Sequence, residues 1–427
     1  MLEIKNITRQ TVDDALTEMR SRAASANERI DRTVAGVMAD VEARGYEAVK
    51  EYSLKFDRAE PYEITKDELR RAAEECPKEL YAAMERAAAN IRDYQSRLLP
   101  KSSSWTVGQG SVLGQIVRGL TRVGIYVPGG SAAYQSSVLM NAIPAKVAGV
   151  EEIVMVTPPT ENLNNAVMAA AEIAGVDRVI AVGGAQAVAA LTYGAGFIPK
   201  VDKLVGPGNA YVASAKRMAY GRLDIDMVAG PSEVLVIADS TADPIYVAAD
   251  LLSQAEHDAM ASAVLVTDSR KIAESVREQL IIQANRLERR EIIMKSLEDY
   301  GQIFVCETMD EAVELANEIA PEHLEIMTDH PESLLPQIKN AGAVFMGKNS
   351  PEPLGDYMAG PSHVLPTSGT ARFFSPLSVD SFLKKMSVIN YSSADLDAIH
   401  DDIIRFAEAE HLTAHANSIK VRFETKD

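Results

Sequence analysis

The chain has 427 residues, 47% of them hydrophobic, and its 61 acidic against 43 basic residues leave a formal net charge of −18. At about 150 residues per domain, this length predicts two or three domains. An acidic surface repels phosphate groups, which argues against nucleic acid and anionic membranes as partners. Cys76 and Cys306 can supply neither a disulfide framework nor a thiolate zinc site, so we interpret them as reduced thiols.

The N-terminal segment carries charges where a signal peptide would need an apolar stretch, and no apolar run of about 18 residues follows. We therefore expect a cytoplasmic protein with no membrane span. Up to Pro100 the sequence predicts helices. Apolar residues recur at helical spacing from Ile30 to Val41, ahead of Gly45, and again from Leu80 to Leu98.

From Val112 onward, short β-rich runs alternate with helical stretches. The predicted strands are 124–127, 153–156, 179–182, 204–205, 234–237, 263–266, 303–305, 324–326 and 343–346. The predicted helices between them are 136–148, 162–174, 185–193, 210–220, 244–257, 270–297 and 310–319. This alternation predicts βαβ units and parallel sheets, with ligands at the carboxyl ends of the strands. We expect an α/β fold with two Rossmann-like parallel-sheet modules, a helical N-terminal region and a small, mostly helical C-terminal segment from about Val379.

The predicted helix 244–257 offers the first candidate site. Asp243 and Pro244 form a typical start, an N-cap followed by proline at the first helical position. Gln254 and His257 are three residues apart and share a face. Because a carboxylate binds zinc better than a neutral carboxamide does, the residues alone favour Glu256 as a metal ligand. The alternative is a solvated polar helix end.

Glu322 and His323 form the second candidate site, on a turn after Pro321 and before an apolar strand. A carboxylate and an imidazole side by side can share general acid–base work, because histidine titrates near neutral pH. The alternative is an exposed polar turn.

A third candidate is the Gly/Pro-rich loop 353–366, which carries Asp356 and His363 and follows a predicted strand. Its alternative is a structural loop whose aspartate caps its own backbone. Near the C-terminus, His411 and His415 have the spacing of a helical zinc pair. No third ligand lies close to them in sequence, so we discount that interpretation.

Three glycine-bearing turns follow predicted strands, at 126–130, 183–186 and 206–209. The last opens a helix, and a helix N-terminus suits an anion. It is not the usual dinucleotide fingerprint, because position 211 is tyrosine where that pattern needs glycine. The turns favour a nucleotide or substrate crevice without identifying the ligand. The residues by themselves thus indicate an α/β enzyme with a mononuclear metal site built from His, Asp and Glu or Gln.

Several segments, in this order, resemble the histidinol dehydrogenase family over residues 30–420. They are Gly206-Pro-Gly-Asn-Ala-Tyr-Val212, Ala229-Gly-Pro-Ser-Glu-Val-Leu235, Asp250-Leu-Leu-Ser-Gln-Ala-Glu-His257, Ala320-Pro-Glu-His323, Gly355-Asp-Tyr357, His363-Val-Leu-Pro-Thr367 and Leu412-Thr-Ala-His415. The resemblance implies a zinc-dependent, NAD-linked enzyme that oxidises L-histidinol to L-histidine, the last step of histidine biosynthesis.

The resemblance also implies a metal site. One zinc ion per subunit would be bound by the residues that match the family's ligands, Gln254, His257, Asp356 and His415. Gln254 thereby replaces Glu256, the choice that chemistry alone favoured. Without a thiolate to saturate it, the ion keeps room for substrate in its coordination shell.

The family's reaction has two hydride transfers, from alcohol to aldehyde and from hydrated aldehyde to carboxylate. The resemblance makes His323 the general base and Glu322 the residue that activates the hydrating water. Ser232, Glu410, His323 and the four zinc ligands match substrate-contacting positions. Tyr126, Gln186 and Asn209 match NAD-contacting positions.

With this resemblance in mind, we divide the chain into four parts. They are an N-terminal segment (1–20), a discontinuous first α/β domain with the zinc and catalytic residues (21–122 plus 233–378), a second Rossmann-like domain with the NAD-contacting turns (123–232) and a C-terminal dimerisation segment (379–427). The family is homodimeric with shared active sites, so Glu410 and His415 would serve the partner subunit.

Three other functions compete with this interpretation. A relative could oxidise another alcohol, such as a small diol, although the presence of both Ser232 and Glu410 favours histidinol. A zinc hydrolase could use Glu322 to activate water. A non-catalytic nucleotide-binding protein is disfavoured, because the polar residues are spread over four separate loops.

Overall fold

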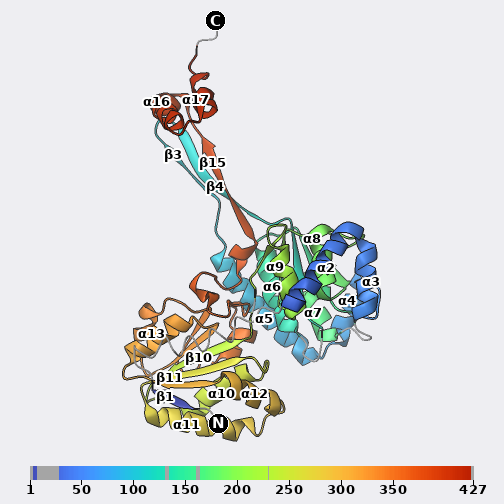
Figure 1. The fold of residues 1–427 in the computed structure, drawn as a ribbon, viewed down its shortest axis with the longest axis vertical. Helices are drawn as coiled ribbons and strands as arrows, with labels where there is room; N and C mark the ends of the chain where they lie inside the picture. The colour runs from blue at the N-terminus through green and yellow to red at the C-terminus, as the bar shows by residue number, and fades with distance from the viewer. Residues whose placement is uncertain (1–2, 7–27, 130–133, 160–163, 229, 425–427) are drawn as a thin grey trace. The chain divides into compact units, whose positions relative to one another are not determined.

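The computed structural model describes residues 3–6, 28–129, 134–159, 164–228 and 230–424 (Figure 1). It divides into two compact units, which we call the main unit (1–98 and 120–382) and the small unit (99–119 and 383–427). The predicted N-terminal segment 1–20 lies outside the described residues except for 3–6. Among the described residues, no helix combines the length and apolar character that crossing a bilayer requires. Cys76 and Cys306 are free and buried.

The main unit contains two six-stranded sheets. The first has the strand order β2 (Tyr62–Ile64), β7 (Arg178–Ala181), β6 (Glu152–Thr157), β5 (Arg122–Tyr126), β8 (Lys203–Val205) and β9 (Asp224–Ile225). The second has the order β1 (Ile4–Asn6), β12 (Gln302–Val305), β11 (Ser262–Thr267), β10 (Glu233–Ala238), β13 (His323–Met327) and β14 (Ala343–Met346). All neighbouring strands are parallel except β2 and β7. The predicted pair of parallel-sheet modules is confirmed.

Helices cover both sheets, and Figure 1 shows the blue-to-green helices gathered around the first sheet. With the first sheet lie α2 (Glu28–Arg44), α3 (Tyr46–Phe56), α4 (Lys66–Glu75), α5 (Lys78–Leu98), α6 (Gln135–Val147), α7 (Asn165–Ala174), α8 (Gly184–Tyr193) and α9 (Ala210–Ala219). With the second sheet lie α10 (Pro244–Ala255), α11 (Arg270–Ala284), α12 (Arg290–Tyr300), α13 (Met309–Ile319) and the short α14 (Pro331–Leu334) and α15 (Glu352–Tyr357). Asp243 caps α10 through the amide of Ile245, as predicted.

The N-terminal helices pack differently from the predicted division, which joined residues 21–122 to 233–378. Val34 and Val41 of α2 lie in one apolar cluster with Val156 and Ile180 of the first sheet. Strand β2 also extends that sheet. The apolar stripe of α2 was clear from the sequence, but a stripe does not identify the sheet that covers it.

Two predicted elements need correction. The helix predicted at 270–297 is two helices, α11 and α12, although both contribute to the same core cluster through Ala284 and Ile293. These residues are nine apart, which puts them on opposite faces of a continuous helix, so the chain must turn between them. The C-terminal segment from Val379 is mostly helical, as predicted, but it also contains strand β15 (Leu383–Asn390), which the sequence did not indicate.

The small unit is a three-stranded antiparallel sheet with two helices. β15 pairs with β4 (Ser111–Gly119), which pairs with β3 (Ser103–Val107), followed by α16 (Ser393–Ala409) and α17 (Thr413–Lys420). The paired residues of β15 and β4, such as Leu383 and Gly119, lie far apart in sequence, so periodicity alone could not foresee this sheet. Asp395 binds the unit together by accepting hydrogen bonds from Gln109 and Ser111 in the β3–β4 hairpin.

A buried ion pair holds the turn after β8. Lys216 Nζ lies 2.5 Å from Asp226 Oδ1, and their side chains are only 5% and 3% exposed. Both bind the same residue: Lys216 donates to the carbonyl of Gly206, and Asp226 accepts from its amide, each at 2.8 Å. Gly206 has φ of +104°, and a Cβ there would lie 2.2 Å from the carbonyl oxygen of Tyr126. The turn therefore needs both glycine and this pair.

Replacing Asp226 by alanine would leave the Lys216 ammonium buried without its carboxylate. We expect the free energy of unfolding to fall by about 3–5 kcal/mol. The control is Asp299→Ala, which breaks a Lys–Asp pair of 2.7 Å on the surface of α12 and should cost less than about 1 kcal/mol. Urea unfolding followed by circular dichroism measures both variants. Equal losses would contradict the role given to burial.

Candidate active site

The acid–base residues lie at the amino ends of strands in the second sheet, not at the carboxyl ends that parallel sheets led us to expect. His323 is the first residue of β13, and Glu233 is the first residue of β10, which pairs with it in parallel register. Gln254 and His257 lie at the end of α10 and just beyond it, where the chain has returned to the start of the next strand. Ser232 immediately precedes β10.

Glu322 and His323 do not form an exposed turn. They are 7% and 4% exposed, and the left-handed conformation of Ala320 (φ 52°) turns the chain out of α13 and into this position. His323 Nδ1 lies 3.0 Å from the carbonyl oxygen of Glu233. Since a carbonyl only accepts, Nδ1 carries the proton, and Nε2 keeps a free lone pair in the neutral ring.

Burial lowers the pKa of His323 to about 4, so the ring is neutral at physiological pH. Its Nε2 lies 3.7 Å from Glu352 Oε1, and its ring stands 6.0 Å from that of Phe345. A neutral imidazole with an unprotonated nitrogen facing carboxyl groups can accept a proton, which is the task of a general base.

The carboxyl group of Glu322 is held by the backbone of the neighbouring strand. Its Oε2 accepts a hydrogen bond of 2.9 Å from the amide of Glu233, and lies 3.6 Å from His323 Nδ1. Burial, and then the negative charge of Glu233, raise the pKa of Glu322 well above its usual range. When it is ionised, a buried carboxylate with a raised pKa is a stronger base than a solvated carboxylate.

A second group of side chains could hold a metal ion. Ligand atoms of His257, Glu352 and Asp356 all lie within 4.8 Å of one another. Gln254, on the same face of α10 as His257, has a buried Oε1 with no hydrogen-bond partner among the described residues, and Glu352 Oε1 is in the same state. Buried oxygens without donors beside an imidazole and two carboxylates are the surroundings that suit a divalent cation.

Several carboxyl groups are buried close together in this region. Burial raises the pKa of Glu352 to about 8 and that of Glu233 to about 7. Asp356, next to both Glu352 and His363, adds a further carboxyl group. Carboxyl groups crowded away from water are costly to ionise unless a cation or a donor neutralises them, and a bound metal ion would do so.

Glu352 is the residue that sequence reasoning missed, whereas Glu256 caps the end of α10 and is outside the group. The predicted loop after β14 contains the short helix α15, and Glu352 and Asp356 are its first and fifth residues. Their spacing of four places both carboxyl groups on one face of a helix. The sequence would have revealed Glu352 only if this helix had been recognised inside the Gly/Pro-rich stretch.

His363 lies 3.7 Å from Asp356, as the shared loop suggested, and 3.3 Å from Ser137 Oγ of α6.

The three predicted NAD-contacting residues all follow strands of the first sheet at its carboxyl edge. Tyr126 ends β5, Gln186 lies in the first turn of α8 after β7, and Asn209 caps α9 after β8. The Tyr126 hydroxyl accepts from the amide of Gly184, and burial raises its pKa to about 12, so it keeps a proton to donate. This edge offers hydroxyl and amide donors beside two helix N-termini, which fits a phosphate-containing ligand.

Glu410 and His415 lie in the small unit. Glu410 is the residue after α16 and His415 is in α17, and both side chains are exposed. The structure therefore brings together four of the predicted residues of the main unit, Glu322, His323, His257 and Asp356. It places Glu410 and His415 in a separate compact unit.

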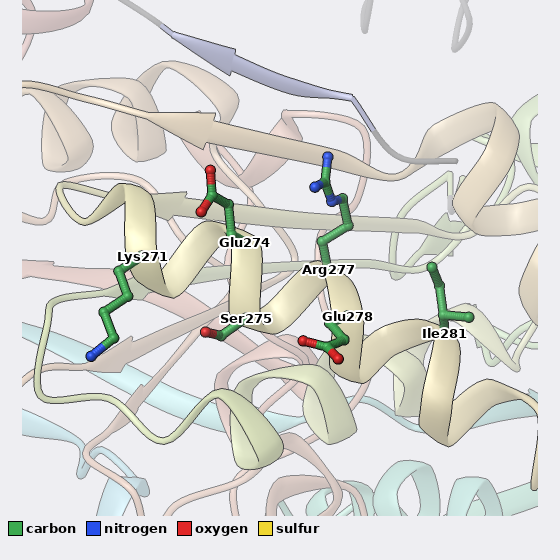
Figure 2. Close-up of a pocket in the computed structure, with 6 residues that line it drawn as sticks. All are labelled: Lys271, Glu274, Ser275, Arg277, Glu278 and Ile281. Atoms are coloured by element: carbon green, nitrogen blue, oxygen red, sulfur yellow. The ribbon is translucent and has the colours of Figure 1, made fainter.

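Two hollows on the described surface differ in their relation to this site. Figure 2 shows one made by six side chains of α11 alone: Lys271, Glu274, Ser275, Arg277, Glu278 and Ile281. Four of the six are charged, the other two being Ser275 and Ile281, and none of the candidate residues is among them. A cavity of about 310 Å³ between α5, α6 and α15 has Asp356 in its wall and Met84 and Leu139 in its lining, so it adjoins the metal-binding group.

Comparison with known proteins agrees with this arrangement. The family model for histidinol dehydrogenase matches residues 20–423. Histidinol dehydrogenase from Clostridium acetobutylicum is 51% identical over 410 residues, 95% of each chain. That from Caldanaerobacter subterraneus is 52% identical over 429 residues, 99% of each chain. The crystal structure of histidinol dehydrogenase from Elizabethkingia anophelis superposes with a TM-score of 0.94 at 36% identity, covering 99% of this chain and 98% of that one.

A match of this extent leaves no room for a hydrolase or a non-catalytic nucleotide-binding protein. Together with the buried His323 and the carboxyl groups around it, it shows that the chain is an oxidoreductase and belongs to the histidinol dehydrogenase family.

Proposed function

We propose that this protein oxidises L-histidinol to L-histidine in two steps, through histidinaldehyde, with NAD as the hydride acceptor in both and one zinc ion per subunit. The observation that carries the proposal is the pairing of β10 with β13, through which the Glu233 backbone orients both the neutral, buried His323 and its neighbour Glu322. A substrate that loses two hydrides from one carbon needs a base for each step and a water between them, and these two side chains are adjacent.

Zinc would be held by Gln254, His257 and Asp356 of one chain, with His415 as the fourth ligand. The main-unit residues supply one imidazole, one carboxylate and one carboxamide whose buried Oε1 has no other partner among the described residues. When bound, the ion would anchor the imidazole and amine of the substrate, which suit a borderline metal. Glu352 supplies a further carboxyl group at the same place.

His323 would remove the proton from the substrate hydroxyl in each oxidation. Its Nδ1–H is committed to the Glu233 carbonyl, so the ring cannot turn and Nε2 is the atom that accepts the proton. Glu322 would accept a proton from the water that adds to the aldehyde carbon. The amide of Glu233 fixes one of its oxygens, and the other remains for the water.

Ser232 and Glu410 would complete the substrate contacts, and Tyr126, Gln186 and Asn209 would contact NAD. Ser232 adjoins Glu233 at the start of β10, next to the acid–base pair. Gln186 is buried and bonded to Asp57 at 3.1 Å, and the Asn209 side chain already caps α9 at Tyr211 and Val212. These two would therefore hold the cofactor through their remaining amide atoms and through the turns that they stabilise.

We further propose a homodimer in which Glu410 and His415 serve the partner's site. The small unit buries no large apolar side chain among its described residues. Trp105, Ile389 and Phe406 are 53%, 74% and 74% exposed. A unit of this size with so much exposed apolar surface needs a larger body to pack against.

Histidinol should drive the reduction of NAD, with two NADH formed per histidinol, and a chelator should stop it. We expect His257→Ala and Asp356→Ala to lose zinc and activity together while remaining folded. His330→Ala is the matched control, because the His330 side chain is 75% exposed and should not affect either property. NADH absorbance and metal analysis of each purified variant measure the outcome. Full zinc occupancy in both variants would remove these residues as ligands.

Loss of Glu322 and loss of His323 should have unequal effects. His323→Ala should slow oxidation of both histidinol and added histidinaldehyde by about 10²–10⁴-fold. Glu322→Gln should slow the aldehyde step more than the alcohol step, because only the aldehyde step consumes water. Assays that start from each substrate separate the two half-reactions. Equal losses in both variants on both substrates would refute this division of roles.

Active sites shared between subunits predict complementation between two inactive variants, His415→Ala and His257→Ala. A mixed dimer would have one site with both histidines and one with neither. After random subunit exchange, about a quarter of wild-type activity should return, because half of the dimers are mixed and each has one intact site of two. If exchange is confirmed independently and activity stays at the level of the separate variants, the C-terminal segment serves its own chain.

A further inference from the structure

Two buried carboxyl groups that the proposed reaction does not use lie beside the metal-binding group. Asp250 in α10 is 8% exposed, and Glu325 in β13 is 1% exposed. Their side chains are hydrogen-bonded to each other. Because an ionised carboxylate can only accept, a hydrogen bond between two carboxyl groups requires that one of them keep its proton.

Asp250 shares a helix face with two proposed zinc ligands. Gln254 follows it by four residues and His257 by seven, so the three side chains line one side of α10 and the turn that continues it. A contact that holds Asp250 in place therefore also helps to hold the side of α10 that carries Gln254 and His257.

Glu325 is connected to the other side of the metal-binding group. It follows His323 by two residues in β13, so both side chains point to the same face of the sheet. Its Oε1 accepts a hydrogen bond of 2.8 Å from the backbone amide of Glu352, the first residue of α15. The Glu325 carboxyl group thus holds the N-terminus of α15, the helix that carries Asp356.

The same place is reinforced by Ser253, whose hydroxyl donates to the Asp250 carbonyl at 2.8 Å and to Glu352 Oε2 at 3.2 Å. Three elements that are far apart in sequence, α10, β13 and α15, therefore meet at one set of hydrogen bonds with Glu325 at its centre.

We propose that the Asp250–Glu325 carboxyl pair positions α10 and α15 so that their metal ligands converge beside His323. The pair is a positioning element that touches neither substrate nor cofactor, and the inference rests on the metal site proposed above. The contact between the two side chains joins β13 to α10, and the hydrogen bond from the Glu352 amide to Glu325 joins β13 to α15.

The acid–base properties of the pair agree with this geometry. Burial, and then the charge of Asp250, raise the pKa of Glu325 well above its usual range, while burial raises that of Asp250 less. Glu325 Oε2 faces no conventional donor among the described residues.

The test uses the full chain, freed of metal, and Co²⁺ as the probe, because its visible absorption reports ligand geometry. Asp250→Ala and Glu325→Ala should each weaken Co²⁺ binding by about 10–100-fold and change the spectrum. The double variant should be no weaker than the weaker single one, since both remove the same hydrogen bond. Glu325→Gln should bind almost as wild type does, because its amide can donate to Asp250 and accept from the Glu352 amide.

Two reference variants separate the possible outcomes. Gln302→Ala removes a buried polar side chain from β12 of the same sheet, which β11 and β10 separate from β13, and should leave Co²⁺ binding unchanged. His257→Ala should lose Co²⁺. If His257→Ala instead binds as wild type does, the proposed metal site itself is wrong.

If His257→Ala loses Co²⁺ while the alanine variants of the pair keep the wild-type spectrum, the metal site stands and the positioning role is refuted. A changed spectrum in Glu325→Gln, or additive losses in the double variant, would also refute it. Alanine variants that fail to fold beside a folded Gln302→Ala would make the pair a general folding element, and so overturn a specific role at the metal.

Discussion

The parallel pairing of β10 with β13 is the constraint on which the rest of the site depends. In this register Val234 lies opposite His323, so the first peptide groups of β10 face the first side chains of β13. The Glu233 carbonyl orients the His323 ring and the Glu233 amide holds the Glu322 carboxyl group. A shift of one residue would turn both side chains to the opposite face and lose both contacts.

The second determinant is electrostatic. The amino edge of the second sheet gathers carboxyl groups from β10, β13, α10 and α15 into a region from which water is largely excluded. Their pKa values rise because an ionised carboxylate there lacks solvation, as for Glu352 at about 8. The same burial lowers the pKa of His323. Burial thus favours the neutral form of both kinds of group, which readies the imidazole to accept a proton and leaves the carboxyl cluster suited to a cation.

The two modules use opposite ends of their strands. The first sheet follows the usual rule, with Tyr126 and the capped helices at the carboxyl edge. The second sheet has its acid–base pair at the amino edge, where α10 ends. The rule that ligands bind at the carboxyl ends of parallel strands therefore matches the position of the candidate residues in the first sheet but not in the second.

The sequence determined the features that depend on interactions between residues close together in the chain. Apolar periodicity and capping are local, so the sequence alone determined most helices and strands, the two-module class and the Asp243 cap. Ordered motifs such as Asp250–His257 and Ala320–His323 determined the family. Tertiary structure alone decided which sheet covers α2, that the chain turns between α11 and α12, and that β15 pairs with β4. It also decided that Glu352 and Glu325 join the site, because a contact between residues 27 positions apart leaves no periodic trace in the sequence.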